Sequence, residues 1–409
     1  MTKTEVLIQA IQRATANHYE PLPIVLSRGA GGWVQDVEGK WYQDWLSCYG
    51  AASLGHNHPK LNEAFFRQLE KGLAVCSNAF YHENQFFNAR LVDFCGFEKV
   101  LCSNSGAEAV ESAIKLARKW FSLKHGPKGE NKAEIIVAAE NFHGRTVTIV
   151  SFSSEPLYRF GFGPYTPGFT IVPYGDLDAL EQALEESPYP AGVLIEPRQG
   201  EGGVHLPPHG YLTGAKKLCH MYDATFMLDE IQTGFGRTGE MFAWQHEGEG
   251  AKPDVLILAK TLGSYYPVSA ILTDAERMDA VFTPGTHGST FANNPLACAL
   301  GMAVLDIFTE EKEFLLSNTR TMGALLLEDL RSIKNPLIKE VRGEGLFIGM
   351  EFTPETGRAR KFCEALKDCT PGLLCTDAHN LVLRFLPRLG ITEDELRLGV
   401  QKIKLVLES

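Results

Sequence analysis

Seven short apolar runs between residues 99 and 273 constrain the fold of this chain more than any other feature. Helical or loop material separates them, and the runs are "KVLCSN", "EIIVAAE", "FTIVPY", "AGVLIEP", "TFMLDEI", "DVLILAK" and "VSAILT". Strands that alternate with helices form a mainly parallel sheet with helices on both faces. The sequence therefore predicts an α/β fold around a seven-stranded sheet.

Polar or charged residues end several of these runs. They are Ser103 with Asn104, Glu140, Glu196, Asp229 and Lys260. In such sheets ligands bind at the carboxyl ends of the strands. We therefore expect the functional site at this edge.

Lys260 ends a near-unbroken apolar run, which is typical of a strand buried on both faces. Burial lowers the pKa of a lysine, and a neutral amine is a nucleophile. A strand-end lysine that extends into solvent is the alternative interpretation. Asp229 ends another apolar run, where its carboxylate needs a protonated pyridine nitrogen or an arginine from a neighbouring strand.

The segment "SNSGAEAVESAIKLARKW" predicts a strand end, a turn and an amphipathic helix. Backbone N–H groups at Ser105, Gly106 and Ala107 could bind a phosphate there. An ordinary capped helix, with Ser105 and Glu108 as a capping box, is the alternative. An anion site, a carboxylate and a lysine are what pyridoxal 5'-phosphate needs for its phosphate, ring nitrogen and aldehyde.

The chain resembles class III aminotransferases of the type I pyridoxal-phosphate fold, and among them most the ornithine aminotransferases. The motifs that carry this resemblance occur in the family's order along nearly the whole chain. They are "NHYEPLPIVLSRG", "DWLSCYGAASLGHNHPKL", "SNSGAEAVESAIKLARKW", "NFHGRT", "GFGPYTPGF", "LDEIQTGFGRTG", "KPDVLILAK", "YPVSA" and "HGSTFANNPLACA".

The resemblance implies a set of cofactor-binding residues. Lys260 would join the cofactor aldehyde and move the proton, and Asp229 would keep the pyridine nitrogen protonated. Gln232 would bond the ring hydroxyl, and Phe142 would stack on the ring. The phosphate would be held by Ser105, Gly106, Ala107 and, from the second subunit of a homodimer, Thr290.

The resemblance also implies the substrate contacts. Arg145 would hold the carboxylate far from the cofactor, with Tyr49 beside it. A helix-start arginine paired with a surface acid is the alternative for Arg145. Tyr81 would stand at the substrate entrance, although a core or rim tyrosine fits equally. Arg384 interrupts an apolar strand and needs an acceptor or a cavity, and the family pairs it with Glu201.

We expect a transaminase that moves the terminal amino group of ornithine, or a similar ω-amine, to 2-oxoglutarate. The alternatives are an enzyme of the same fold that does not transaminate, such as an epimerase, a lyase or a carbon–carbon bond-forming enzyme, and an inactive binding protein. Two segments depart from the family, Ser264 with Tyr265 near the lysine and "ANNP" at 292–295. Because of these two departures, the sequence does not decide which amine is the substrate.

Charge and cysteine usage bound the partners and the location. The net charge of -11 argues against nucleic acid or an anionic membrane as a partner. The nine cysteines are scattered without zinc spacing, which predicts reduced thiols, no metal and a cytoplasmic protein. The N-terminal residues show no secretory signal, and no apolar run approaches the ~20 residues that span a bilayer.

The two ends of the chain differ from the middle. Two strand candidates, "VRGEGLFIGMEF" and "NLVLRFLP", flank a helical stretch near the C-terminus and predict a smaller α+β domain. We expect residues 46–300 to form the large cofactor-binding domain and residues 301–409 the small domain. Residues 1–45 are expected to pack with the small domain.

Overall fold

The large sheet has the seven predicted strands, in the order β4-β10-β9-β8-β7-β5-β6. The computed structural model describes residues 1–126, 129 and 131–408. Strand β10 runs antiparallel to its neighbours β4 and β9, and the other strands run parallel to one another. The strands are β4 (Lys99–Ser103), β5 (Glu134–Ala138), β6 (Phe169–Val172), β7 (Pro190–Ile195), β8 (Thr225–Asp229), β9 (Val255–Leu258) and β10 (Ser269–Thr273).

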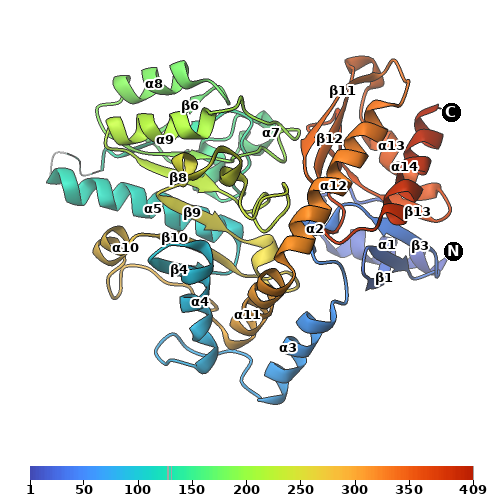
Figure 1. Cartoon of the computed structure of the whole chain (residues 1–409), viewed down its shortest axis with the longest axis horizontal. Helices are drawn as coiled ribbons and strands as arrows, with labels where there is room; N and C mark the ends of the chain where they lie inside the picture. Colours follow the sequence, from blue (N-terminus) through green and yellow to red (C-terminus); the bar gives the residue numbers. More distant parts are fainter. Residues whose placement is uncertain (127–128, 130, 409) are drawn as a thin grey trace.

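Helices cover both faces of this sheet (Figure 1). Successive residues of a strand point to opposite faces, so Val255 and Ile257 of β9 belong to one core and Leu256 and Leu258 to the other. The first core contains α5 (Gly106–His125), α6 (Val147–Ser151) and α10 (Ala275–Val281). The second contains α3 (Pro59–Glu70), α4 (Phe86–Cys95), α8 (Leu177–Glu186), α9 (Tyr211–Met221) and α11 (Pro295–Glu310). Burial on both faces explains why the strands are continuously apolar.

A smaller part contains two four-stranded sheets. One has the order β11 (Ile338–Glu344), β12 (Phe347–Phe352), β15 (Val382–Phe385) and β14 (Thr376–Ala378). The other joins the two ends of the chain, in the order β1 (Leu26–Ala30), β2 (Trp33–Asp36), β3 (Trp41–Asp44) and β13 (Gly372–Leu374). Three helices complete this part, α12 (Lys312–Arg331), α13 (Arg360–Asp368) and α14 (Glu393–Glu408).

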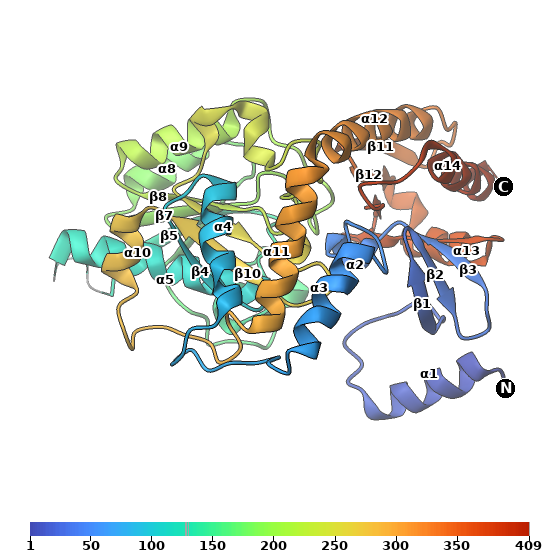
Figure 2. The same cartoon turned by 60° about the horizontal axis from the view of Figure 1, so that its bottom comes forward.

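The parallel pairing of β3 with β13 brings the N-terminal segment to the small part, and Figure 2 shows the two segments side by side. Trp45 lies in the small-part core and is almost fully buried. Helix α11 crosses residue 300, and its side chains through Phe308 lie in the core of the large sheet. We therefore propose the predicted three-part division, with the second boundary moved from residue 300 to the junction of α11 and α12.

No helix among the described residues combines the length and the apolar character that crossing a bilayer requires.

The contact between Trp45 and α14 predicts an unusual response to substitution. A Cβ atom at Gly399 would lie 2.1 Å from Cζ2 of Trp45. Replacing glycine with alanine inside a helix normally stabilises a protein by about 1 kcal/mol. Here the overlap should reverse the sign, and we expect Gly399→Ala to lower the free energy of unfolding by roughly 1–3 kcal/mol in urea denaturation. A variant as stable as the wild type would contradict this packing.

Candidate active site

A cavity of about 430 Å³ lies at the carboxyl ends of the parallel strands. Parallel strands end at one edge, so residues that are far apart in the sequence meet there. The predicted site residues that line this cavity are Gly106, Ala107, Phe142, Glu201, Asp229, Gln232 and Lys260. The expected edge of the sheet therefore does hold a ligand-sized space.

Lys260 begins the short turn η5 (Lys260–Leu262), two residues after β9 ends. Its φ of +46° lies in the left-handed region, which residues other than glycine rarely adopt. Protein atoms surround the ammonium group on the cavity wall, and this burial lowers the pKa of Lys260 to about 8, although the charge of Glu201 opposes the shift. A substantial fraction of Lys260 is thus a neutral amine near pH 8.

Asp229 meets a histidine, and not the neighbouring-strand arginine that the sequence left open. Nδ1 of His143 lies 2.7 Å from Oδ2 of Asp229, and both side chains are buried. Since a carboxylate only accepts, the imidazole donates from this nitrogen. Burial would lower the pKa of His143, but the hydrogen bond and the charge of Asp229 outweigh it and the pKa is raised. Sequence reasoning missed His143, whose one signal was its place next to Phe142.

Glu196 supports the segment that carries Phe142. Its carboxylate accepts from the backbone N–H of Phe142 at 3.0 Å and from that of Gly200 at 3.4 Å. Burial raises the pKa of Glu196 to about 7, so the group changes charge near neutral pH. Its position at a strand end was noticed in the sequence, but no role was assigned to it.

The start of α5 has the features of both earlier interpretations. Ser105 and Glu108 form the capping box, with Ser105 Oγ accepting from the N–H of Glu108 at 3.3 Å. Gly106 and Ala107 line the cavity, whereas Ser105 lines a neighbouring pocket. The first N–H groups of a helix have no partner within the helix. The backbone at Gly106 and Ala107 can therefore accept an anion while Ser105 caps the helix.

Arg384 and Glu201 form a buried ion pair, with Nη2 and Oε1 2.7 Å apart. Arg384 is 0% exposed, and its guanidinium nitrogens have no well-aligned hydrogen bond to a described residue, so the contact with Glu201 is mainly an ion pair. Burial, the largest single effect, would raise the pKa of Glu201, but the charges of Arg384, Lys260 and Arg145 together outweigh it and the pKa is lowered. A buried guanidinium without hydrogen bonds is ready to receive a planar anion.

The other predicted residues lie around the cavity or outside it. The Arg145 guanidinium stacks 3.6 Å from the ring centroid of Tyr158 and 5.4 Å from that of Phe142. The carbonyl of Tyr49 accepts from Nε2 of Gln232 at 2.9 Å, and the Tyr49 ring lies 5.6 Å from the Arg384 guanidinium. Six predicted residues are not part of the cavity lining of their own chain. Four of them are Tyr49, Ser105, Arg145 and Arg384; the other two are Tyr81, which is 97% exposed, and Thr290, which is also exposed.

Comparison with known proteins places this chain in a family. The model of the family "Aminotransferase class-III" matches residues 14–407. The chain belongs to the class III aminotransferases. It is 46% identical to an ornithine aminotransferase of Brevibacillus brevis over 100% of this chain and 99% of that one.

Solved structures of class III aminotransferases are similar throughout. The ornithine aminotransferase of Toxoplasma gondii has a TM-score of 0.94 and 36% identity, covering 100% of this chain and 96% of that one. An acetylornithine aminotransferase from Elizabethkingia anophelis has a TM-score of 0.87 and 41% identity, with both chains fully covered. The predicted type I pyridoxal-phosphate fold is confirmed.

Class III aminotransferases use pyridoxal 5'-phosphate, and the residues of this cavity fit it. The unpartnered N–H groups at the start of α5 suit the phosphate, and buried Asp229 suits a protonated ring nitrogen. Lys260, with its lowered pKa, supplies the amine that the aldehyde needs. A Cβ atom at Gly106 would lie 2.9 Å from Cδ1 of Ile231, so glycine keeps the helix end close to the cavity.

Residues 264–265, where the sequence is expected to depart from the ornithine aminotransferases, make defined contacts in the structure. The Tyr265 hydroxyl donates to the carbonyl of Gly55 at 3.1 Å and accepts from the N–H of His58. The ring thus fixes the loop beside Lys260 to the start of α3. Ser264 lines the cavity with φ +48°, and its Oγ is buried without a hydrogen bond. The cavity wall here is tyrosine and serine, as the sequence indicated.

The buried amine makes a prediction for stability. A lysine whose folded pKa of about 8 lies below its unfolded value destabilises the fold at neutral pH, and the penalty fades as pH rises from about 8 to 10.5. We expect Lys260→Met to raise the free energy of unfolding of the cofactor-free protein near pH 7 by up to about 3 kcal/mol. Urea denaturation across this pH range measures the gain, which should shrink toward high pH.

Lys334→Met, which changes an exposed lysine, is the control. A Lys260→Met gain that is absent, or that does not change with pH, would contradict the burial of a titrating amine.

Proposed function

We propose that this chain transfers the terminal amino group of ornithine to 2-oxoglutarate. The products are glutamate and glutamate semialdehyde, and the semialdehyde cyclises to pyrroline-5-carboxylate. Support comes from the relatives named for ornithine, at 46% identity over the full chain, and from the charges that surround Lys260. Ornithine presents its terminal amine with its α-carboxylate far from the reacting carbon, whereas 2-oxoglutarate has one carboxylate near that carbon and one far from it. The site must therefore bind carboxylates at two distances from the reacting carbon.

We propose that the residues at the sheet edge carry the chemistry. When bound, pyridoxal phosphate supplies an aldehyde that bonds amines and a ring that accepts electrons. Lys260 Nζ, whose pKa of about 8 allows it to gain and lose a proton near neutral pH, moves the proton from the carbon that bears the transferred amine. Asp229, oriented by His143, holds the proton on the ring nitrogen. Phe142 would stack on the ring and Gln232 would bond its hydroxyl, since both line the cavity, and Glu196 accepts from the backbone N–H of Phe142.

Two arginines divide the carboxylate binding. Arg145 holds the far carboxylate of ornithine in the first step and of 2-oxoglutarate in the second. Arg384 holds the carboxylate of 2-oxoglutarate that lies next to its keto group. A free Arg384 would also bind the α-carboxylate of amino acids in the first step, and would therefore favour the wrong donors. Glu201 neutralises Arg384 while ornithine is bound and swings away when the dicarboxylate enters.

The observation that carries this proposal is the state of the Arg384 guanidinium. It is fully buried, it has no well-aligned hydrogen bond among the residues that the structure describes, and Glu201 pairs with it from the loop after β7. A charge buried this way costs several kcal/mol unless a counter-ion meets it. Since Glu201 is one carboxylate on a side chain that also lines the cavity, a substrate carboxylate can replace it at little electrostatic cost.

Other functions have less support. The resemblance left open an enzyme of the same fold that does not transaminate, but the family match is to aminotransferases, and the comparisons give the alternative no support. A lysine of lowered pKa at the cavity, Lys260, and the buried carboxylate of Asp229 argue against an inactive binding protein. Acetylornithine, which a relative's name includes, is the nearest competing donor.

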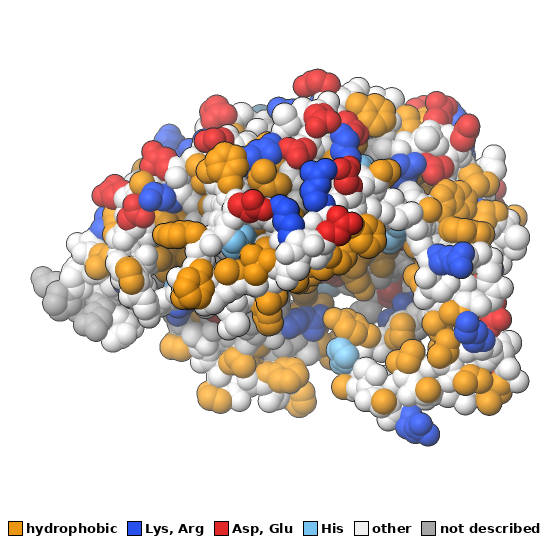
Figure 3. All heavy atoms as spheres, turned by 90° about the horizontal axis from the view of Figure 1, so that it is seen from below, with side chains coloured by type: hydrophobic (Ala, Val, Ile, Leu, Met, Phe, Trp, Pro, Cys, Tyr) orange, Lys and Arg blue, Asp and Glu red, His pale blue; other side chains and the backbone are white. Residues whose placement is uncertain are grey.

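We propose a homodimer with shared active sites. Figure 3 shows hydrophobic side chains gathered around a hollow on the face of α3 and α4. Large exposed hydrophobic residues here are Phe66 of α3, Phe86 of α4, Phe80 of the segment between them and Phe291 of the segment before α11. Thr290, next to Phe291, is exposed and does not line its own cavity, as expected of a residue that binds the phosphate in the partner. Tyr81 is placed to act in the same way.

We also propose a cytoplasmic location. All nine cysteines are free thiols, which suits a reducing compartment.

The gate predicts a change of donor preference. With purified enzyme and 2-oxoglutarate, ornithine should yield pyrroline-5-carboxylate and glutamate in equal amounts. Glu201→Ala uncovers Arg384, so kcat/KM for an α-amino donor such as glutamate, relative to ornithine, should rise roughly 10- to 100-fold. Glu249→Ala, which removes an exposed carboxylate, is the control. An unchanged ratio would refute the gate, and a wild type that uses acetylornithine but ignores ornithine would refute the substrate.

The role of Asp229 predicts a loss of turnover without loss of fit. Asp229→Ala removes a preorganised charge from the reacting ring, and we expect kcat to fall roughly 100- to 1,000-fold while KM for ornithine changes little. Steady-state kinetics at saturating pyridoxal phosphate measures both constants. Near-normal turnover would show that Asp229 does not serve the ring nitrogen.

A further inference from the structure

The loop that carries Glu201 has a strained backbone. Gln199 and His205 close the loop as a two-residue bridge, with N–H···O distances of 3.0 and 3.1 Å. Val204 is 0% exposed and has φ +58°, an unfavourable conformation for a β-branched residue. Such strain persists only where neighbours enforce it. Neighbouring residues must therefore hold the backbone of this loop in its strained conformation.

The neighbour is a row of three residues on one small-part sheet. In the register of β11, β12 and β15, Arg342 lies opposite Gly349 and Gly349 lies opposite Arg384. Residues directly opposite in a sheet project to the same face. Arg342, Gly349 and Arg384 therefore form one line across three strands, on the face of this sheet that contacts the Glu201 loop.

Each member of this row contacts the loop. Arg342 Nε donates to the carbonyl of Val204 at 2.9 Å, and its Nη2 donates to the carbonyl of Gly203 at 2.7 Å. A Cβ atom at Gly349 would lie 2.9 Å from Cβ of Val204, so only glycine leaves room for that side chain. The third member, Arg384, forms the ion pair with Glu201. The row thus holds the loop in three ways: Arg342 bonds its backbone carbonyls, Gly349 leaves room for Val204, and Arg384 pairs with the charge of Glu201.

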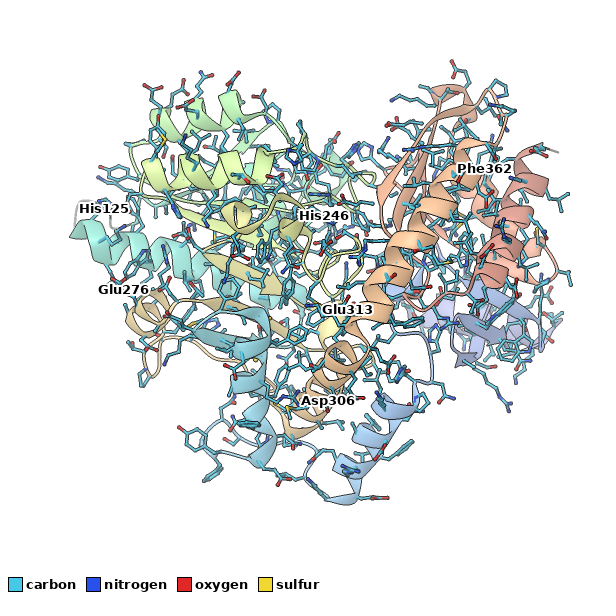
Figure 4. The ribbon with its side chains drawn as sticks, viewed as in Figure 1. His125, His246, Glu276, Asp306, Glu313 and Phe362 are labelled. Carbon is cyan, nitrogen blue, oxygen red and sulfur yellow. The ribbon has the colours of Figure 1, made fainter. Side chains whose placement is uncertain are left out.

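Arg342 is itself held rigidly. Its Nη1 donates to Glu340 at 2.8 Å and to Glu351, and its side chain is 11% exposed. The end of the same strand is fixed to the large part, because Glu344 accepts from Nε of Arg198 at 2.8 Å. His246, labelled in Figure 4 on the large part near this junction, lies 3.3 Å from Glu344. Strand β11 therefore brings a fixed guanidinium fork to the loop.

We propose that Arg342 is a positioning residue for substrate selection, which holds the loop so that Glu201 reaches Arg384. The loop backbone stays docked on the row of Arg342, Gly349 and Arg384, and only the Glu201 side chain swings during the reaction. This inference rests on the proposed function, since it concerns the same gate. Loss of Arg342 should therefore resemble loss of Glu201 in donor preference.

The test compares donors in the full enzyme with pyridoxal phosphate. Arg342→Ala should raise kcat/KM for glutamate relative to ornithine about tenfold, because Glu201 no longer stays over Arg384. Arg342→Lys keeps the charge but loses the two-pronged donation, so it should give a smaller shift in the same direction. Lys339→Ala is the matched control, since Lys339 is on the same strand, pairs with the same Glu351 and is not bonded to the loop.

A double mutant separates positioning from a general structural role. In the Glu201→Ala background, Arg342→Ala should leave the donor ratio unchanged, because the group that it positions is gone. A shift that persists in this background, or single variants that lower both activities equally with the ratio constant, would overturn the proposal. Gly349→Ala, which displaces Val204 without touching a charge, should also shift the ratio and serves if Arg342→Ala does not fold.

Failure of the proposed function would look different. If wild-type enzyme ignores ornithine, or Glu201→Ala leaves the ratio unchanged, the gate itself is refuted and not only the role of Arg342. If Glu201→Ala shifts the ratio and neither Arg342→Ala nor Gly349→Ala does, the gate stands and the positioning proposal is wrong.

Discussion

The burial of one ammonium group is the constraint on which the rest of this structure depends. Lys260 follows a strand covered by helices on both faces, and its pKa of about 8 is the result of that burial. The backbone of Lys260 has a left-handed φ, which is unfavourable for a residue with a side chain. The surrounding structure must hold this conformation in place. The same edge gathers Asp229 and Glu196, whose negative charges partly offset the cost of placing Lys260 there.

The large sheet by itself leaves Glu201 without its arginine partner. Arg384 comes from the middle of a sheet in the small part, and that sheet also supports the loop of Glu201 through Arg342. Both halves of the ion pair are therefore set by one sheet, although Glu201 and Arg384 are far apart in the chain. The N-terminal strands stabilise this arrangement through β3, which pairs with β13, and through Trp45.

Most of the fold could be predicted because its signals are local. Each of the seven strands leaves an apolar run, and their alternation with helices indicates a parallel sheet. Boundaries were less exact, since the run that ends on Lys260 leaves the strand after Leu258. The antiparallel direction of β10 was not predicted either, although its connection from β9 is too short for a helical crossover and so favours an antiparallel neighbour. For the cofactor, the sequence offered a phosphate site and a capping box at Ser105 as alternatives, and it could not show that Ser105 caps α5 while Gly106 and Ala107 line the cavity.

The sequence alone determined the family, the α/β sheet and the identity of the chemical groups, because these depend on residue types and their spacing along the chain. Only the tertiary structure decided which of these groups contact one another. His143 was invisible as the partner of Asp229, and Arg342 as the support of the Glu201 loop, since both contacts join strands and loops separated by more than 80 residues. Distances of 2.7 to 2.9 Å between such groups arise from strand register and helix packing. No local pattern in the sequence specifies that register, because it depends on how distant strands pair in the folded chain.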